Sequence, residues 1–143
     1  MPSSTRSRGD QLDHVVAQLF VAVESMRAFY VQCAAQFDLT PPQARVLLMA
    51  GQPCSQRDLA AQFSCDASNI VGIVDRLQQR GLVSRQASPS DRRVKQVMLT
   101  SAGDQMRRAF QSRLQAQVPV LSELDDDELA RFEHLLAHFA SNA

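Results

Sequence analysis

The sequence lacks any apolar stretch long enough to cross a bilayer. Its unbroken apolar runs, such as Val46–Ala50, reach five residues, whereas a membrane-spanning helix needs about 20. The first ten residues are rich in serine and arginine and have no apolar centre, so they do not resemble a secretory signal. We therefore expect a cytoplasmic protein that has no membrane partner.

Glycine is scarce, and the motifs of common enzyme families are missing. The five glycines stand singly along the chain and form no phosphate-cradling loop. Neither a G-x-S-x-G nucleophile turn nor an H-E-x-x-H zinc motif occurs. The sequence therefore predicts a protein that is not an enzyme and that holds no cofactor.

The three cysteines form no C-x-x-C pair and are odd in number, which indicates a reducing compartment. Cys33 is either a packed small hydrophobe or a redox-sensing thiol. His134 and His138 are four residues apart, a helical spacing that can hold a metal. A third ligand, His14, would have to come from a second chain. A metal- or thiol-based sensor is therefore an alternative function.

Charge is distributed unevenly, although the 15 basic and 15 acidic side chains balance over the 143 residues. Residues 54–99 carry 7 basic and 4 acidic side chains, whereas residues 100–143 carry 4 and 7. A basic segment beside an acidic one suits a protein that presents one face to nucleic acid. The chain length is that of one domain.

A long first helix is predicted by apolar residues that recur every three or four positions from Leu12 to Tyr30. We assign residues 1–10 to a disordered tail and residues 11–38 to a dimerisation helix, because a small domain cannot cover so long a stripe alone. A second stripe runs along 129–139. Either the two stripes pack on each other within one chain, or they form a homodimer, which the length of the first helix favours.

A helix-turn-helix is predicted in the middle of the chain. Thr40 and Ser55 each begin a capping box, three residues before a side chain that can reach back to them. Asp66 begins the next helix, and Gly81 follows its end. Because only two residues precede the Asp66 cap after the second helix, the last two helices should cross steeply, as a helix-turn-helix does.

The pattern after this helix changes to that of a β-hairpin followed by two helices. Residues 82–85 and 93–99 have the composition of short strands, joined by a polar turn. Residues 100–143 contain two further helix starts, at Thr100 and Asp125. The predicted fold class is mainly α with a small β-hairpin.

The order of these elements resembles the MarR family of bacterial regulators. The specific matches lie in Leu39–Ala50, Asn69–Arg85 and Ser88–Gly103. The resemblance implies a winged helix-turn-helix at 39–99, embedded in an α-helical dimerisation scaffold as one compact structural domain. It also implies a homodimer whose first and last helices interlock. The interface residues would include Leu12, Val15, Leu19, Leu129, Phe132, Leu136 and Phe139.

DNA contacts are predicted on the outward face of the helix that Asp66 begins. Asn69 can pair with adenine, Gly72 offers no side chain, and Arg76 suits a phosphate. Basic residues at the hairpin tip suit the minor groove. The full set of candidate DNA contacts is Gln56, Arg57, Ser68, Asn69, Gly72, Arg76, Arg92 and Arg93.

Two details of this surface come from helix geometry and from the resemblance. Gln56 and Arg57 fall in the first turn of a helix, where free N–H groups favour phosphate. By resemblance, Asp75 pairs with an arginine of the wing, and we expect Arg93 to brace the wing.

These features predict a sequence-specific DNA-binding transcriptional regulator of double-stranded, palindromic sites. The resemblance implies a repressor that a small-molecule or oxidant effector releases. An effector pocket is expected near Tyr30, Phe37, Arg45 and Met49. The alternative is a winged helix that binds a protein partner.

Overall fold

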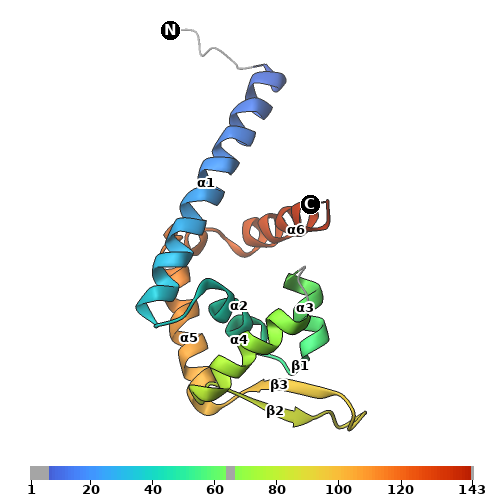
Figure 1. Ribbon diagram of the computed structural model, residues 1–143. Helices are drawn as coiled ribbons and strands as arrows, with labels where there is room; N and C mark the ends of the chain where they lie inside the picture. Colours follow the sequence, from blue (N-terminus) through green and yellow to red (C-terminus); the bar gives the residue numbers. More distant parts are fainter. Residues whose placement is uncertain (1–6, 64–66, 143) are drawn as a thin grey trace.

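The computed structural model describes residues 7–63 and 67–142, without the side chains of residues 67, 68, 140 and 142. Its elements are α1 (Arg8–Gln36), α2 (Pro41–Met49), β1 (Cys54–Ser55), α3 (Gln56–Phe63), α4 (Ala67–Gln79), β2 (Val83–Ala87), β3 (Lys95–Leu99), α5 (Ser101–Gln115), a short 3-10 helix (Pro119–Ser122) and α6 (Asp126–Asn142). Strands β2 and β3 and the turn between them form the wing. The predicted fold class, mainly helical with a small β-hairpin, is confirmed (Figure 1).

The first helix begins earlier than the sequence predicted. Ser7 caps it, because the Ser7 hydroxyl oxygen accepts a hydrogen bond from the Asp10 backbone N–H at 3.2 Å. Residues 8–10 are therefore helical, and the assignment of these residues to a disordered tail is wrong. Residues 1–6 of that tail lie outside the described residues. The helix ends at Gln36, two residues before the predicted boundary.

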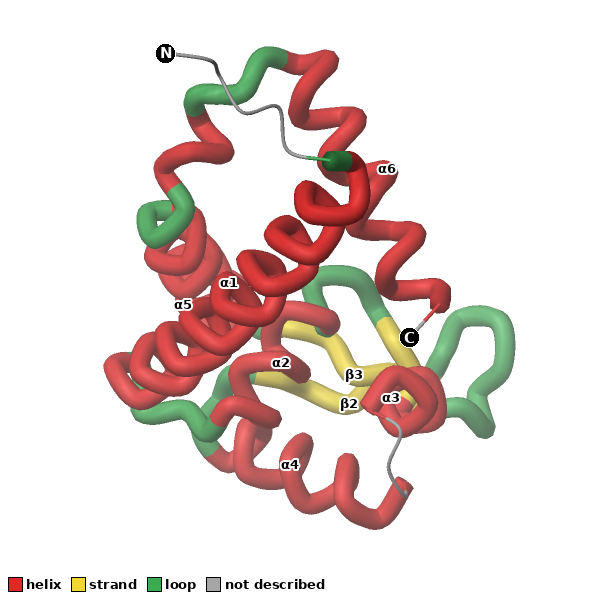
Figure 2. The backbone as a smooth tube through the Cα atoms, turned by 90° about the horizontal axis from the view of Figure 1, so that it is seen from above, coloured by secondary structure: helices red, strands yellow, loops and turns green. Residues whose placement is uncertain are grey.

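Helices α1, α2, α4 and α5 enclose the core, and the view from above places α2 between α1 and α4 (Figure 2). Leu47, Ile70, Leu77 and Phe110 are all fully buried there. Each such side chain contributes about 1.5–3 kcal/mol by leaving water. This core fixes the position of α4, whose other face remains free.

The predicted helix starts at Thr40, Ser55, Thr100 and Asp125 are confirmed. Both halves of a capping box are present at Thr40, where the Gln43 side-chain oxygen accepts from the Thr40 N–H at 3.0 Å. Ser55 and Asp125 form the equivalent reciprocal pairs with the residues three positions later. These local pairs satisfy N–H groups that a helix start leaves unpaired.

The sheet has three antiparallel strands in the order β1-β3-β2, one more than the predicted hairpin. Strand β1 has only two residues, Cys54 and Ser55, which pair with Val97 and Gln96. Gly81, at φ 71°, makes the left-handed turn that leads from α4 into β2. The extra strand ties the start of α3 to the base of the wing.

The apolar stripes of α1 and α6 do not cover each other. The N-terminal half of α1 extends away from the body of the molecule (Figure 1). Leu12 and Val15 are 57% and 55% exposed, and Leu136 and Phe139 are 46% and 58% exposed. The alternative in which the two stripes pack together within one chain is therefore wrong. Within the described residues, no helix is long and apolar enough to span a bilayer.

Candidate nucleic-acid interface

Helix α4 has one buried and one exposed face. Ile70, Val74 and Leu77 are fully buried against the core, as the sequence predicted. Asn69, Gly72 and Arg76 lie exposed on the opposite side. Ser68 belongs to the first turn of α4, and its side chain lies outside the described residues. The amphipathic pattern thus leaves a polar row on the outer side of the second helix of the helix-turn-helix.

A groove of about 340 Å³ runs between this row and the start of α2. Its walls are Thr40, Pro42 and Gln43 from α2 and its cap, and Asn69, Gly72, Ile73 and Arg76 from α4. A Cβ atom added at Gly72 would meet nothing within 4 Å. The fold therefore does not require a glycine there, and its absent side chain leaves the groove open.

The wing is braced to α4 by Arg85, a residue that the sequence analysis did not select. Arg85 Nη2 lies 2.6 Å from Asp75 Oδ1, and Arg85 Nη1 donates to Gln78 Oε1 at 2.6 Å. The prediction that Asp75 pairs with a wing arginine is confirmed. The prediction that Arg93 is the brace is wrong, because strand β2 directs Arg85 toward α4, whereas Arg93 is exposed in the turn after β2.

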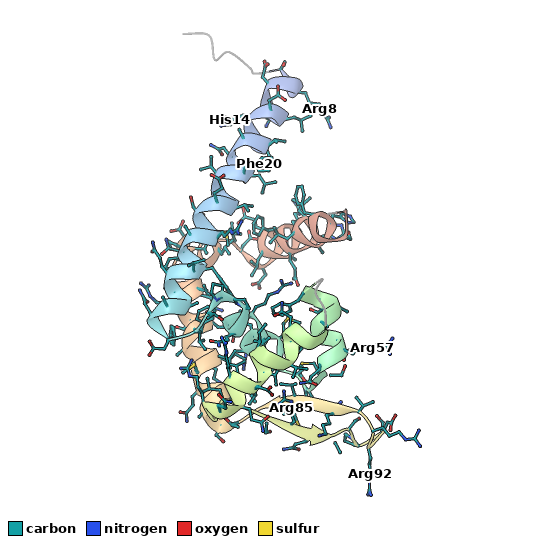
Figure 3. All side chains as sticks on the ribbon, viewed as in Figure 1. Arg8, His14, Phe20, Arg57, Arg85 and Arg92 are labelled. Carbon is teal, nitrogen blue, oxygen red and sulfur yellow. The ribbon has the colours of Figure 1, made fainter. Side chains whose placement is uncertain are left out.

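Gln56 belongs to the same cluster. With its amide oxygen turned toward the Arg85 guanidinium, Gln56 accepts hydrogen bonds from Arg85 Nη2 at 2.9 Å and from Arg85 Nε at 3.0 Å. The side chain therefore helps to hold the brace, and the predicted phosphate contact of Gln56 stays a prediction. Arg57 and Arg92 are exposed, and Figure 3 shows them at the outer edge, from α3 and from the wing tip.

The four candidate effector residues are divided by the structure. Tyr30 and Phe37 both pack edge-on against Phe110, with ring centroids 5.4 and 5.6 Å away, where α1 meets α5. Met49 packs against the same core. Arg45 instead stacks on Phe63 at 4.4 Å and donates to the Gln62 carbonyl at 2.7 Å. Arg45 therefore fastens α2 to the end of α3, a link that sequence spacing does not reveal.

Tyr30 carries a hydroxyl that is enclosed and has no hydrogen-bond partner within the described part of the chain. Burial raises the pKa of Tyr30 to about 12, although the charge of Arg45 opposes the shift. The group is therefore neutral at physiological pH. An enclosed hydroxyl without a partner costs about 1–3 kcal/mol, so a ligand that supplied an acceptor would recover this energy.

The structure bears on one of the two sensor alternatives, the redox thiol. Cys33 is fully buried, and burial raises the pKa of its thiol, which disfavours the reactive thiolate. The expectation of a redox thiol at Cys33 therefore conflicts with its environment, which is that of a packed hydrophobe. The rings of His134 and His138 lie 4.5 Å apart. No group of three potential metal ligands occurs among residues 7–63 and 67–142.

A further arginine joins α4 to the end of α1. Arg80 donates from Nη1 to the Asp38 carbonyl at 2.5 Å and from Nη2 to the Phe37 carbonyl at 3.2 Å. Asp38 has a φ of 53°, so the chain makes a left-handed turn at this point. These bonds satisfy carbonyl groups that the end of α1 leaves free. The two helices are thereby linked directly.

Comparison with known proteins agrees with this architecture. The family model described as "MarR family" matches residues 39–95. The chain is 28% identical over 131 residues to YcgE, an HTH-type transcriptional regulator of Bacillus subtilis, covering 88% of this chain and 84% of that protein.

Two solved structures extend the likeness. A probable transcriptional regulator from Pseudomonas aeruginosa is 30% identical, with a TM-score of 0.59, covering 87% of this chain and 98% of that one. CouR from Rhodococcus jostii RHA1, solved with bound p-coumaroyl-CoA, is 27% identical, with a TM-score of 0.69 and coverage of 95% and 96%. The matched segment contains the helix-turn-helix and most of the wing, and the chain belongs to the MarR family of transcriptional regulators.

Proposed function

We propose that this protein is a sequence-specific DNA-binding transcriptional regulator that acts in the cytoplasm. The supporting observation is that the exposed face of α4 and the arginine-bearing wing are held together by the Arg85–Asp75 pair. Helix α4 then enters the major groove, and the wing tip lies against the flanking minor groove. Asn69 reads base edges, whereas Arg57, Arg76 and Arg92 contact the backbone or minor groove.

The exposed stripes of α1 and α6 support a homodimer. A continuous apolar surface of this kind marks a protein interface, and closed two-fold dimers are the commonest assemblies. Two-fold symmetry then gives a palindromic operator with half-sites about 34–36 Å apart. Binding to a promoter at such a site would repress transcription.

Arg92→Ala tests the wing contact. A plot of log K against log salt has a negative slope, and each lost phosphate contact makes it shallower by about 0.9. We expect the slope to become shallower by about that amount per protomer, in gel shifts on a duplex selected by the wild-type protein from a random pool. Arg8→Ala, at the far end of α1 (Figure 3), is the matched control and should leave the slope unchanged. Equal slopes for both variants would contradict the contact. Absence of a retarded band for the wild type would favour the protein-interaction alternative.

The enclosed Tyr30 hydroxyl supports regulation by a small molecule that enters between α1 and α5. We expect Tyr30→Phe to leave the free protein at least as stable as the wild type, because it removes an unpaired polar group. The same change should reduce the melting-temperature rise produced by phenolic and aromatic thioester compounds in a thermal-shift screen. A full ligand-induced rise in Tyr30→Phe would show that the hydroxyl does not bind the effector.

A further inference from the structure

Gln43 has an unused hydrogen-bond donor at the groove between α2 and α4. The side chain is only 7% exposed, and its oxygen is occupied by the Thr40 N–H at 3.0 Å. Its amide nitrogen donates no hydrogen bond to any residue that the structure describes. Among the described residues, the Tyr30 hydroxyl is the one fully enclosed side-chain polar atom without a partner. The Gln43 nitrogen also has no partner among them, so it is not fully enclosed. It is therefore reached from outside, through the groove that Gln43 lines.

The backbone at the start of α2 supplies no competing donor. Pro41 and Pro42 occupy its first two positions and have no N–H. The next N–H, that of Gln43, already donates to the Thr40 hydroxyl at 3.4 Å. The donor available to a ligand here is thus the Gln43 side chain, in the weakly positive field of the helix start.

The opposite wall of the groove supplies a positive charge. Arg76 lines it and is exposed, and its side chain forms no ion pair or hydrogen bond with the described residues. Within residues 7–63 and 67–142, no acidic side chain lines the groove, although Asp75 is adjacent in sequence, because Asp75 turns toward Arg85. The open space at Gly72 lets a ligand reach both donors. An amide N–H and an arginine without an acidic neighbour favour an anion.

We propose that this groove binds one phosphodiester of the DNA backbone at the edge of the major groove that α4 enters. The Gln43 amide donates to a phosphate oxygen, and Arg76 neutralises its charge. This inference rests on the proposed DNA-binding function and assigns α2 a part in it. The duplex, not a free anion, is the ligand, since Asn69 on the same wall belongs to the base-reading row of α4.

Gln43→Glu tests the contact with little change to the fold. Glutamate keeps an oxygen for the Thr40 N–H and is itself a usual residue at this capping position, but it replaces the donor by a negative oxygen. We expect about tenfold weaker binding, the effect of losing one hydrogen bond to a charged group. A phosphate carries no sequence information. The loss should therefore be equal on a selected duplex and on a scrambled duplex of the same length.

Gln115→Glu is the control, because it adds the same charge at an exposed position at the end of α5, away from the wing (Figure 1). Thermal unfolding checks that both variants are folded. A duplex series with one neutral methylphosphonate at each position then locates the phosphate. The penalty of Gln43→Glu should vanish at one position per half-site, which a free anion cannot produce.

Three results would overturn the groove assignment while leaving the proposed function intact. They are equal affinities of Gln43→Glu and Gln115→Glu, a loss confined to the selected duplex, and no methylphosphonate position that relieves the penalty. Failure of the wild-type protein to bind either duplex would instead overturn the proposed function itself.

Discussion

Replacing Leu136 by glutamate should convert the proposed dimer into a monomer and weaken operator binding at least about a hundredfold. Leu136 is 46% exposed in the single chain and lies on the α6 stripe with Phe132 and Phe139. In a dimer, the carboxylate would be buried without a partner, which costs several kcal/mol. Separate protomers also lose the effective concentration that links two half-sites, a factor of about 10²–10⁴. Light scattering after gel filtration measures the mass, and gel shifts measure the affinity.

Ala137→Glu is the matched control for this variant. Ala137 is exposed on α6, and the neighbouring helical position turns it away from the stripe of Leu136. The same charge is therefore added to the same helix without entering the proposed interface. We expect this variant to remain dimeric and to bind DNA as the wild type does. A dimeric Leu136→Glu variant, or a monomeric wild type, would contradict the interface.

The sequence predicted the helix starts well because capping is local. Thr40 meets Gln43, and Ser55 meets Asp58, within three residues, so each pair is readable without knowledge of the fold. The buried face of α4 was equally readable, because a helical repeat of apolar residues fixes which side meets the core. These two kinds of signal were sufficient to place these helix starts and to orient α4.

Long-range contacts were not predicted, because no local pattern specifies them. Strand β1 exists only through its pairing with β3, about forty residues away along the chain. Arg45 and Arg80 reach backbone carbonyls 17 and 42 residues away, respectively. From the sequence alone, either arginine could equally well have been an exposed charge that contacts only water. For the same reason the link from Arg45 to the end of α3 was not predicted.

The choice between Arg85 and Arg93 as the residue that braces the wing shows how far the candidate site could be predicted from the sequence. Both residues lie in the basic hairpin, and alternation along β2 decides which side chain faces α4. In the structure, Arg85 pairs with Val97 across the sheet and points toward Asp75, whereas Arg93 falls in the turn. A shift of one residue along β2 would have turned Arg85 away from α4.

Asp75→Asn should weaken operator binding about tenfold while costing about 1 kcal/mol or less of folding stability. The Asp75 and Arg85 side chains are 49% and 18% exposed, so solvent screens much of their attraction. Their larger contribution is to hold the wing at a fixed position relative to α4, and a binding surface that loosens by about 1 Å loses much of its fit. Asp104→Asn is the control, because it breaks ion pairs with Arg107 and Arg108, at 2.8 and 2.9 Å, within α5.

The sign of the change in operator affinity separates a loss of wing positioning from a direct electrostatic effect of the lost charge. Asp75→Asn removes a negative charge beside the DNA-facing row, and this alone should strengthen binding to any duplex. A loss of operator affinity can therefore arise only from a misplaced wing. A double-mutant cycle with Arg85→Gln should then show losses that do not add, since either change breaks the same brace. Unchanged or tighter operator binding by Asp75→Asn, or fully additive losses, would show that the pair does not position the wing.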